Sequence, residues 1–180
     1  MMNSLPYIQL PDHLPGMHGL LAFRPAIAPS LGALTNTLLR SDEGLSRGER
    51  ELIGAFVSAL NDCFICQNIH GAVAQCHLGV DEDFVEKVKL DFQHSALSEK
   101  MKSLLAIADS TQRGGKFVTR EQVEFARQQG ATDLEIHDTV LIAGLFCLFN
   151  RYIDGLGVTS DDTKETFQKR AKMLAENGYQ

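Results

Sequence analysis

The chain has 180 residues, of which 44% are hydrophobic, and 17 Lys and Arg against 23 Asp and Glu give a formal net charge of −6. This apolar share at a modest charge excludes a disordered chain, and the acidic balance argues against a nucleic-acid binder or a protein of anionic membrane surfaces. The length favours one domain, and four cysteines are too few for a disulfide scaffold.

The beginning of the sequence lacks the features of a signal peptide. The first basic residue is Arg24, and the preceding residues contain no long apolar core. The longest apolar run, Val140 to Phe149, has about half the length that a membrane span needs. We therefore expect a soluble, cytoplasmic protein with no membrane and no nucleic-acid partner, in which thiols stay reduced unless they are catalytic.

Residues 1–29 form a proline-rich N-terminal arm. They hold all five prolines of the chain, at positions 6, 11, 15, 25 and 29. Because proline fixes φ and has no N–H donor, we expect an extended arm or loop here, without regular elements. Residues 30–180 are predicted to form a single all-α domain.

Helical signals follow one another along this domain, and no segment shows sustained strand alternation. The predicted helices lie near residues 30–40, 46–60, 62–78, 81–90, 98–113, 119–129, 132–150 and 160–177. Four of them begin at a residue that commonly caps helices, three times in a capping box: Ser46, Asp81, Thr119 and Thr132. Gly79 and Gly130 stand where a left-handed residue would end the preceding helix.

A sequence echo predicts an internal duplication of helical hairpins. Residues 45–53 resemble residues 97–105, at an offset of 52, and residues 79–85 resemble residues 130–136, at an offset of 51. Chance similarity between amphipathic helices is the alternative. The first copy alone carries Glu51, Cys63, Cys66 and His70, so packing did not require these residues if the duplication is real.

Three of these four residues, Cys63, Cys66 and His70, form a candidate reactive group. At about 100° per helical residue, Cys66 lies roughly 60° from Cys63, and His70 roughly 40° from Cys66, so all three share one face. Two cysteines at this spacing reach disulfide distance with little backbone change. Asn61 or Asp62 is expected to cap the helix, which would place the thiols in its first turns, where the helix dipole favours a thiolate.

Three interpretations of the cysteine pair remain open at this point. A Cys-x-x-Cys pair in a cytosolic chain indicates redox chemistry or metal binding. A structural zinc needs four ligands, and Cys63, Cys66 and His70 supply three, while His77 lies roughly 10 Å further along the same helix. Two inert buried thiols are the third interpretation. We favour redox chemistry, and we expect neither a metal nor a cofactor.

Glu51 has two possible environments. It lies near the start of a helix that is apolar from Leu52 to Leu60 except at Gly54 and Ser58, so this helix is expected to be buried nearly all round. A buried Glu51 would need a partner and would suit proton transfer near pH 7. A Glu51 that faces water in the first turn is the equal alternative.

The pattern Glu51-x11-Cys63-x2-Cys66-x3-His70, with Ser58-x2-Asn61, resembles the alkylhydroperoxidase D (AhpD) group of the carboxymuconolactone decarboxylase superfamily, in its peroxidase-related subgroup. The resemblance runs from about residue 30 to 160 and includes residues 150–157. It implies an all-α AhpD-like bundle, a homo-oligomer, and peroxide reduction by the thiol pair.

The resemblance also assigns roles. By position, Cys66 matches the peroxidatic cysteine, Cys63 the resolving cysteine, and His70 and Glu51 the proton relay. The hydroperoxidases of the family carry a histidine between the two cysteines, where this sequence has Ile65.

The leading hypothesis is therefore a cysteine-based hydroperoxide reductase that takes a peroxide substrate and an external dithiol reductant, either a lipoylated or a thioredoxin-like protein. One alternative is a decarboxylase of a small cyclic acid, and another is a non-enzymatic redox-sensing oligomer. We interpret Cys76 and Cys147 as small core residues, and Arg151 with Asp154 as a solvated pair.

Overall fold

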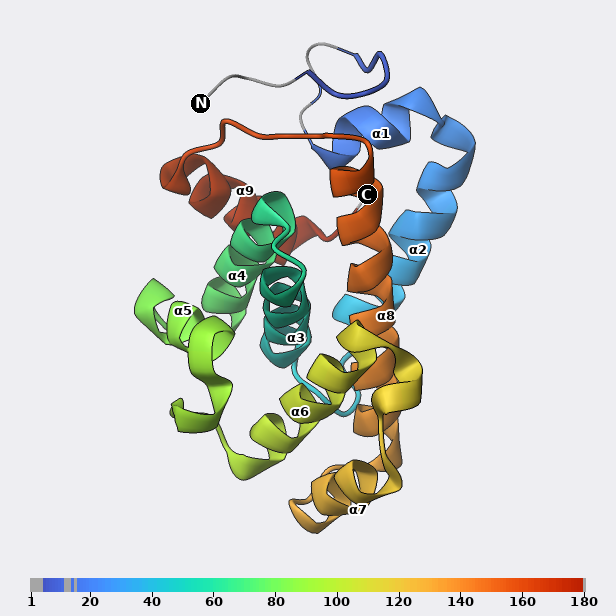
Figure 1. Ribbon diagram of the computed structural model, residues 1–180. Coiled ribbons are helices and arrows are strands. Elements are labelled where there is room, and N and C mark those ends of the chain that lie inside the picture. The colour runs from blue at the N-terminus through green and yellow to red at the C-terminus, as the bar shows by residue number, and fades with distance from the viewer. Residues whose placement is uncertain (1–4, 12–13, 15, 180) are drawn as a thin grey trace.

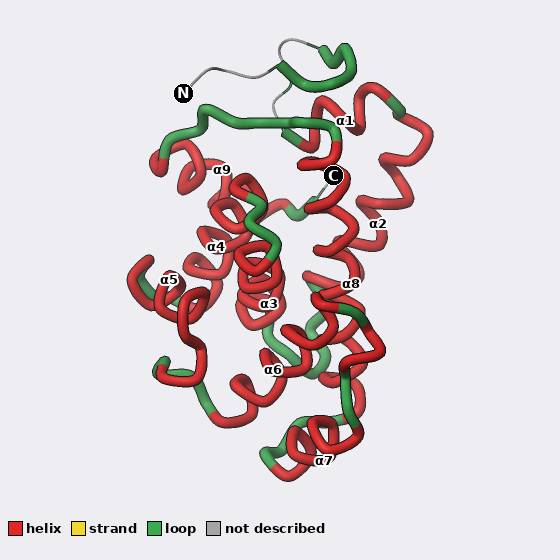
Figure 2. The backbone as a smooth tube through the Cα atoms, in the orientation of Figure 1, coloured by secondary structure: helices red, strands yellow, loops and turns green. Residues whose placement is uncertain are grey.

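The computed structural model describes residues 5–11, 14 and 16–179, and this part of the chain contains helices, turns and loops but no strand (Figure 2). The helices are α1 (Met17–Phe23), α2 (Ala28–Leu39), α3 (Arg47–Leu60), α4 (Phe64–Leu78), α5 (Glu82–Asp91), α6 (Glu99–Arg113), α7 (Arg120–Gln128), α8 (Asp133–Gly155) and α9 (Lys164–Asn177). Short 3-10 turns cover Pro25–Ile27, Phe92–His94 and Gly115–Phe117. The all-α prediction is confirmed.

The capping residues explain where the helices begin. Ser46, Thr119 and Thr132 each accept a hydrogen bond from the backbone three residues on, and the residue there returns one, which completes three capping boxes. Asp81 accepts from the backbone N–H of Phe84 and caps α5. The predicted helix starts at these four residues are confirmed.

The prediction that residues 1–29 lack regular structure is wrong for α1 and for the turn Pro25–Ile27. Pro25 and Pro29 stand in the first turn of a helical segment, where a missing N–H costs nothing. Leu20 of α1 is fully buried in the core, so tertiary packing stabilises this short helix. Residues 1–4, 12, 13 and 15 of the arm lie outside the described residues.

Helix α3 is the centre of the molecule (Figure 1). It packs against α4, α5, α6 and α8, and α9 covers α4 from the other side. Nearly every residue of α3 from Gly48 to Ser58 is buried, as its apolar sequence predicts. Helix α7 lies at the end of the molecule furthest from α1 (Figure 1).

Helices α3 and α8 approach closely at Gly54. A Cβ atom at Gly54 would lie 2.3 Å from the ring of Phe146, so only a residue without a side chain fits there. The Phe146 ring in turn meets the His70 ring edge-on, with centroids 4.5 Å apart and an interplanar angle of 90°. The contact between α3 and α8 therefore places the Phe146 ring against one side of the His70 imidazole.

A buried arginine joins α3 to its neighbours. Arg50 is fully buried and donates to the carbonyls of Leu38, Glu43 and Leu45 at 2.9, 2.5 and 3.0 Å. Its guanidinium also pairs with the Asp138 carboxylate of α8 at 2.7 Å. These bonds satisfy the charge inside the protein and fix the loop between α2 and α3.

The two copies of the sequence echo fall on corresponding helices. Ser46 caps α3 and Ser98 caps α6, while Asp81 caps α5 and Thr132 caps α8. This correspondence agrees with a duplicated helical unit.

Helix α8 has one buried and one exposed side. Among the described residues it is the one helix that by length and composition alone could cross a membrane, and 56% of its most apolar stretch lies buried, as in the core helix of a soluble protein. On its outer side Leu134, Leu141 and Leu148 recur every seven residues and are 42%, 40% and 49% exposed. We call these three residues the α8 leucine stripe.

Candidate active site

The link between α3 and α4 positions the two thiols. Asp62 adopts a left-handed conformation, with φ at 56°, and the N–H of Cys63 bonds to the carbonyl of Ser58 at 2.9 Å. Cys63 is therefore the N-cap residue of α4, and Cys66 lies in its first turn. The prediction that Asn61 or Asp62 caps this helix is wrong, because the tight turn moves the helix start one residue further along.

Cys63 and Cys66 carry free, buried thiols that lie next to each other. The hydrogen bond from Cys66 lowers the pKa of Cys63, against the opposing effect of burial. The hydrogen bond with Cys63, followed by burial, raises the pKa of Cys66. The pair therefore loses a first proton readily and holds a second one strongly.

The two sulfurs differ in access. A cavity of about 850 Å³ lies between α1, α2, α4, α8 and α9, and Cys66 and His70 both line it. Cys63 is not among the described residues that line this cavity, and its exposed fraction is 0%. The walls are mainly apolar, so a molecule that enters the cavity meets Cys66 and not Cys63.

His70 is held by a buried carboxylate. Its Nδ1 lies 2.7 Å from Glu51 Oε2, and the exposed fractions of His70 and Glu51 are 7% and 1%. The structure thus selects the buried environment of Glu51 over the solvated one. It brings together Glu51, Cys66 and His70, as the sequence analysis predicts, with Cys63 next to Cys66.

Tyr179 is a member of this group that the sequence analysis missed. Its hydroxyl donates to Glu51 Oε1 at 2.7 Å and lies 3.2 Å from His70 Nδ1. Its ring stacks on the imidazole, with centroids 5.6 Å apart and an interplanar angle of 22°. Burial, and then the Glu51 carboxylate, raise the pKa of Tyr179 well above its usual value, so the phenol keeps its proton.

Ser58 and Asn61 both form hydrogen bonds with Asn150 of α8, which links them to the thiols. The Asn150 amide donates to Ser58 Oγ at 3.1 Å and accepts from Asn61 Nδ2 at 2.8 Å, while Asn61 accepts from Gln112 at 2.8 Å. The same Asn150 side chain bonds to the Cys66 sulfur and opposes the rise in the pKa of Cys66. A polar network therefore orients an amide donor toward the thiol.

Asp154 lies next to Cys63. It bonds to the Cys63 side chain and raises the pKa of Cys63, while burial raises the pKa of Asp154 itself. Arg151 instead donates to the carbonyl of Cys147, so the expected solvated pair between Arg151 and Asp154 does not describe this site. The Asp154 carboxylate thus opposes thiolate formation at Cys63.

Two other predictions concern the remaining cysteines and a metal. Cys147 is partly buried, but Cys76 is exposed on α4, so its interpretation as a core residue is wrong. In the described part of the chain, no group of three or more His, Cys, Asp and Glu side chains could hold a metal ion.

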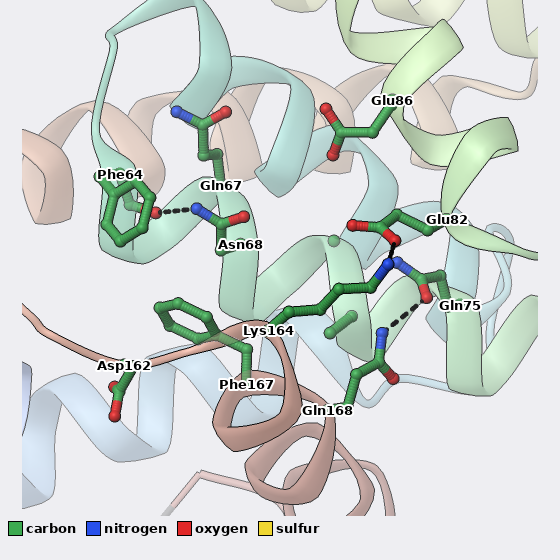
Figure 3. A pocket seen from close by; sticks show the side chains of 12 residues that line it. Phe64, Gln67, Asn68, Gln75, Glu82, Glu86, Asp162, Lys164, Phe167 and Gln168 are labelled. Carbon is green, nitrogen blue, oxygen red and sulfur yellow. Dashed lines mark hydrogen bonds and ion pairs between the residues drawn. The ribbon is translucent and has the colours of Figure 1, made fainter.

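A second, smaller cavity of about 230 Å³ lies on the face of α4 that meets α5 and α9 (Figure 3). Two pairs of its polar side chains bond to each other: Gln168 donates to Gln75 at 2.9 Å, and Lys164 pairs with Glu82. Neither thiol is among its described lining residues. The larger cavity is therefore the candidate active site.

Comparison with known proteins supports the all-α fold. The family model for the carboxymuconolactone decarboxylase family matches residues 82–161, which begin after the cysteine pair. A solved structure from Ralstonia eutropha, described as an alkylhydroperoxidase AhpD core and an uncharacterised peroxidase-related protein, has a TM-score of 0.77 and 26% identity, and the match covers 91% of this chain and 93% of that one.

A second solved structure, an uncharacterised peroxidase-related protein from a Silicibacter species, has a TM-score of 0.79 at 24% identity, over 93% of this chain and 99% of that one, and shows the same fold. A search of curated proteins finds no match. The all-α fold, the match to the family model over residues 82–161 and the shared fold of the AhpD core structure together support an AhpD-like member of the carboxymuconolactone decarboxylase superfamily.

Proposed function

We propose that the protein is a cysteine-based hydroperoxide reductase. The observation that carries the proposal is that Cys66 shares the large cavity with His70, which a buried Glu51 holds at 2.7 Å, while Cys63 is hydrogen-bonded to Cys66 away from the cavity. A nucleophile, a base with an orienting carboxylate, and a second thiol are the parts that thiol peroxidation needs.

The proposed cycle begins at Cys66. His70 takes the Cys66 proton, the thiolate attacks one peroxide oxygen, and the O–O bond breaks. The leaving oxygen takes up the proton and departs as an alcohol or water, and Cys66 becomes a sulfenic acid. Cys63 then attacks the Cys66 sulfur, water leaves, and a disulfide forms. The hydrogen bond with Cys63 and burial raise the pKa of the Cys66 thiol, so the first step depends on His70 to remove its proton.

The disulfide is reduced by thiol–disulfide exchange with an external dithiol, and we propose a lipoylated or thioredoxin-like protein as its donor. Ile65 stands where the hydroperoxidases of the family have a second histidine. His70 and Asn150 are therefore the groups that activate Cys66 here, and a slower reaction than in proteins with both histidines follows.

A decarboxylase-type reaction on a small cyclic acid is the alternative function. The observation that favours it is the match of residues 82–161 to the carboxymuconolactone decarboxylase family model. In that reaction the large cavity binds the acid, and the cysteines have no direct part.

We also propose that the protein is a cytoplasmic homo-oligomer. The α8 leucine stripe supports self-association, because three exposed leucines at heptad spacing form a seam that a second helix can cover. Leu134 and Leu148 lie at equal distances along the helix on either side of Leu141, so an antiparallel copy of the same helix would match this stripe.

The experiment is peroxide-dependent oxidation of the reduced protein, followed by counting of free thiols and re-reduction with an added dithiol. We expect two thiols lost per chain, a Cys63–Cys66 disulfide by mass spectrometry, and turnover when the dithiol is in excess. Cys66→Ser should abolish this turnover, and Cys76→Ser, which alters an exposed thiol of the same helix, should preserve it.

Two results would contradict the proposal. Turnover of a cyclic acid that Cys66→Ser leaves intact, without peroxide turnover, would favour the decarboxylase. Oxidation that changes the assembly of the protein but gives no turnover with any dithiol would favour a redox sensor.

A further inference from the structure

The segment that follows α9 is fixed to α2 by its backbone. Gly178 turns the chain with φ at 82°, and the N–H of Tyr179 bonds to Asn36 Oδ1 at 2.9 Å, while the Asn36 amide donates to the carbonyl of Tyr179. Arg40 donates to the carbonyls of residues 174 and 175 at 3.0 Å. These anchors hold the Tyr179 ring where it stacks on the His70 imidazole, with centroids 5.6 Å apart.

The hydrogen bonds around Glu51 link its protonation state to the tautomer of His70. The Tyr179 hydroxyl can donate to Glu51 Oε1 only if that oxygen accepts, and His70 Nδ1 lies 2.7 Å from the other oxygen. An ionised Glu51 accepts both bonds, so the imidazole proton lies on Nδ1 and the Nε2 lone pair is free. A protonated Glu51 would instead donate to Nδ1, and the proton of a neutral His70 would then lie on Nε2.

We propose that Tyr179 is a positioning residue of the relay, whose hydroxyl stabilises the Glu51 carboxylate and thereby keeps His70 in the tautomer with a free Nε2. Its consequence for peroxide reduction rests on the function proposed above. Because Glu51 is 1% exposed, water does not replace a lost donor there.

Other charged or titratable groups also face Tyr179 or Glu51. Arg40 of α2 acts on the Tyr179 hydroxyl, where it opposes the rise in the pKa of Tyr179, and Cys66 of α4 acts with the opposite sign. Burial lowers the pKa of His77, further along α4, and the Glu51 charge opposes this effect. The Tyr179 hydroxyl is the group among them that bonds to Glu51 Oε1.

The test is Tyr179→Phe, which removes the hydroxyl and keeps the ring stacked on His70. We expect the rate of Cys66 alkylation by iodoacetamide, measured on the reduced protein by mass spectrometry, to fall about tenfold near neutral pH. We also expect the rise of this rate with pH to move to higher pH, because the Glu51 carboxylate loses the hydrogen bond that stabilises its charge. Tyr152→Phe, which removes a hydroxyl elsewhere in the structure, should leave the profile unchanged.

A second measurement needs no variant. The ¹⁵N chemical shifts of the His70 ring in the unmodified protein should report a protonated Nδ1 and a bare Nε2 near neutral pH, and Tyr179→Phe should convert part of the population to the other tautomer. Superimposed alkylation profiles, or a proton on Nε2 in the unmodified protein, would overturn the inference. Neither readout uses peroxide, so a failure of the proposed reductase activity would show separately, as unmodified protein that peroxide does not oxidise.

Discussion

Replacement of Glu51 by Gln should slow the reaction of Cys66 while preserving the fold. The glutamine side chain has a single accepting oxygen, whereas both Glu51 oxygens make hydrogen bonds, Oε1 with the Tyr179 hydroxyl and Oε2 with His70 Nδ1, at 2.7 Å each. The amide nitrogen must therefore face one of these partners, and an N–H directed at His70 Nδ1 forces the imidazole proton onto Nε2. In that orientation the base that we propose for the Cys66 proton is lost, and in the other orientation the Tyr179 hydroxyl loses its acceptor.

The magnitude follows from the burial of the pair. A hydrogen bond to a charged group contributes about 1.5–3 kcal/mol, and the 1% exposure of Glu51 excludes water from compensating for it. At about 1.4 kcal/mol per factor of ten, the rate near neutral pH should fall about 10- to 100-fold. The free energy of unfolding should change little, because a neutral amide is cheaper to bury than a carboxylate and Gln is a good helix former.

The assay is the rate of Cys66 alkylation by iodoacetamide across the pH range from about 5 to 9, resolved by peptide mass spectrometry. Glu49→Gln is the matched control, since Glu49 lies one half-turn earlier on α3 and bonds to Ser46 in the capping box at the surface. Superimposed pH profiles for the unmodified protein and Glu51→Gln would refute the reasoning and leave Cys63, Cys66 and His70 as the whole site.

Two further predictions concern stability and assembly. Arg50→Met leaves the Asp138 carboxylate and three carbonyls without their buried donor, so it should lower the free energy of unfolding in urea by about 3–5 kcal/mol. Arg47→Met breaks a solvated pair with Asp42 and should lower it by less than about 1 kcal/mol. Equal losses would contradict the analysis of Arg50. Leu141→Glu in the α8 leucine stripe should convert the oligomer to a monomer of 19.8 kDa, measured by light scattering. The same change at Leu90, which is 86% exposed on α5, should leave the oligomer intact. An unmodified protein that is monomeric at micromolar concentration would exclude the oligomer.

The positions of the helices could be predicted from the sequence because their ends are set locally. A capping box at Ser46 or Thr132 uses side chains three residues apart, so the signal and the structure occupy the same few residues. Helix α1 could not be predicted this way. Its seven residues carry no capping side chain, and the packing of Leu20 in the core is a tertiary contact.

The same distinction explains the site. Cys63, Cys66 and His70 could be grouped from spacing alone because they lie on one helix. The choice between a buried and a solvated Glu51 depends on how α3 packs. Tyr179 meets Glu51 from 128 positions further along the chain, and no motif marks that contact. Asn150 and Asp154 likewise enter from α8, and their contacts with the thiols are visible only in three dimensions.

The contact of Gly54 with Phe146 limits how this sequence can change over evolutionary time. Any side chain at position 54 would displace the aromatic ring, and the ring is itself packed edge-on against the imidazole. A mutation at position 54 alone would therefore move the catalytic base that we propose, although Gly54 has no chemistry of its own. A residue with a side chain can replace Gly54 only after a smaller residue has replaced Phe146. The two positions should therefore change together, and in that order.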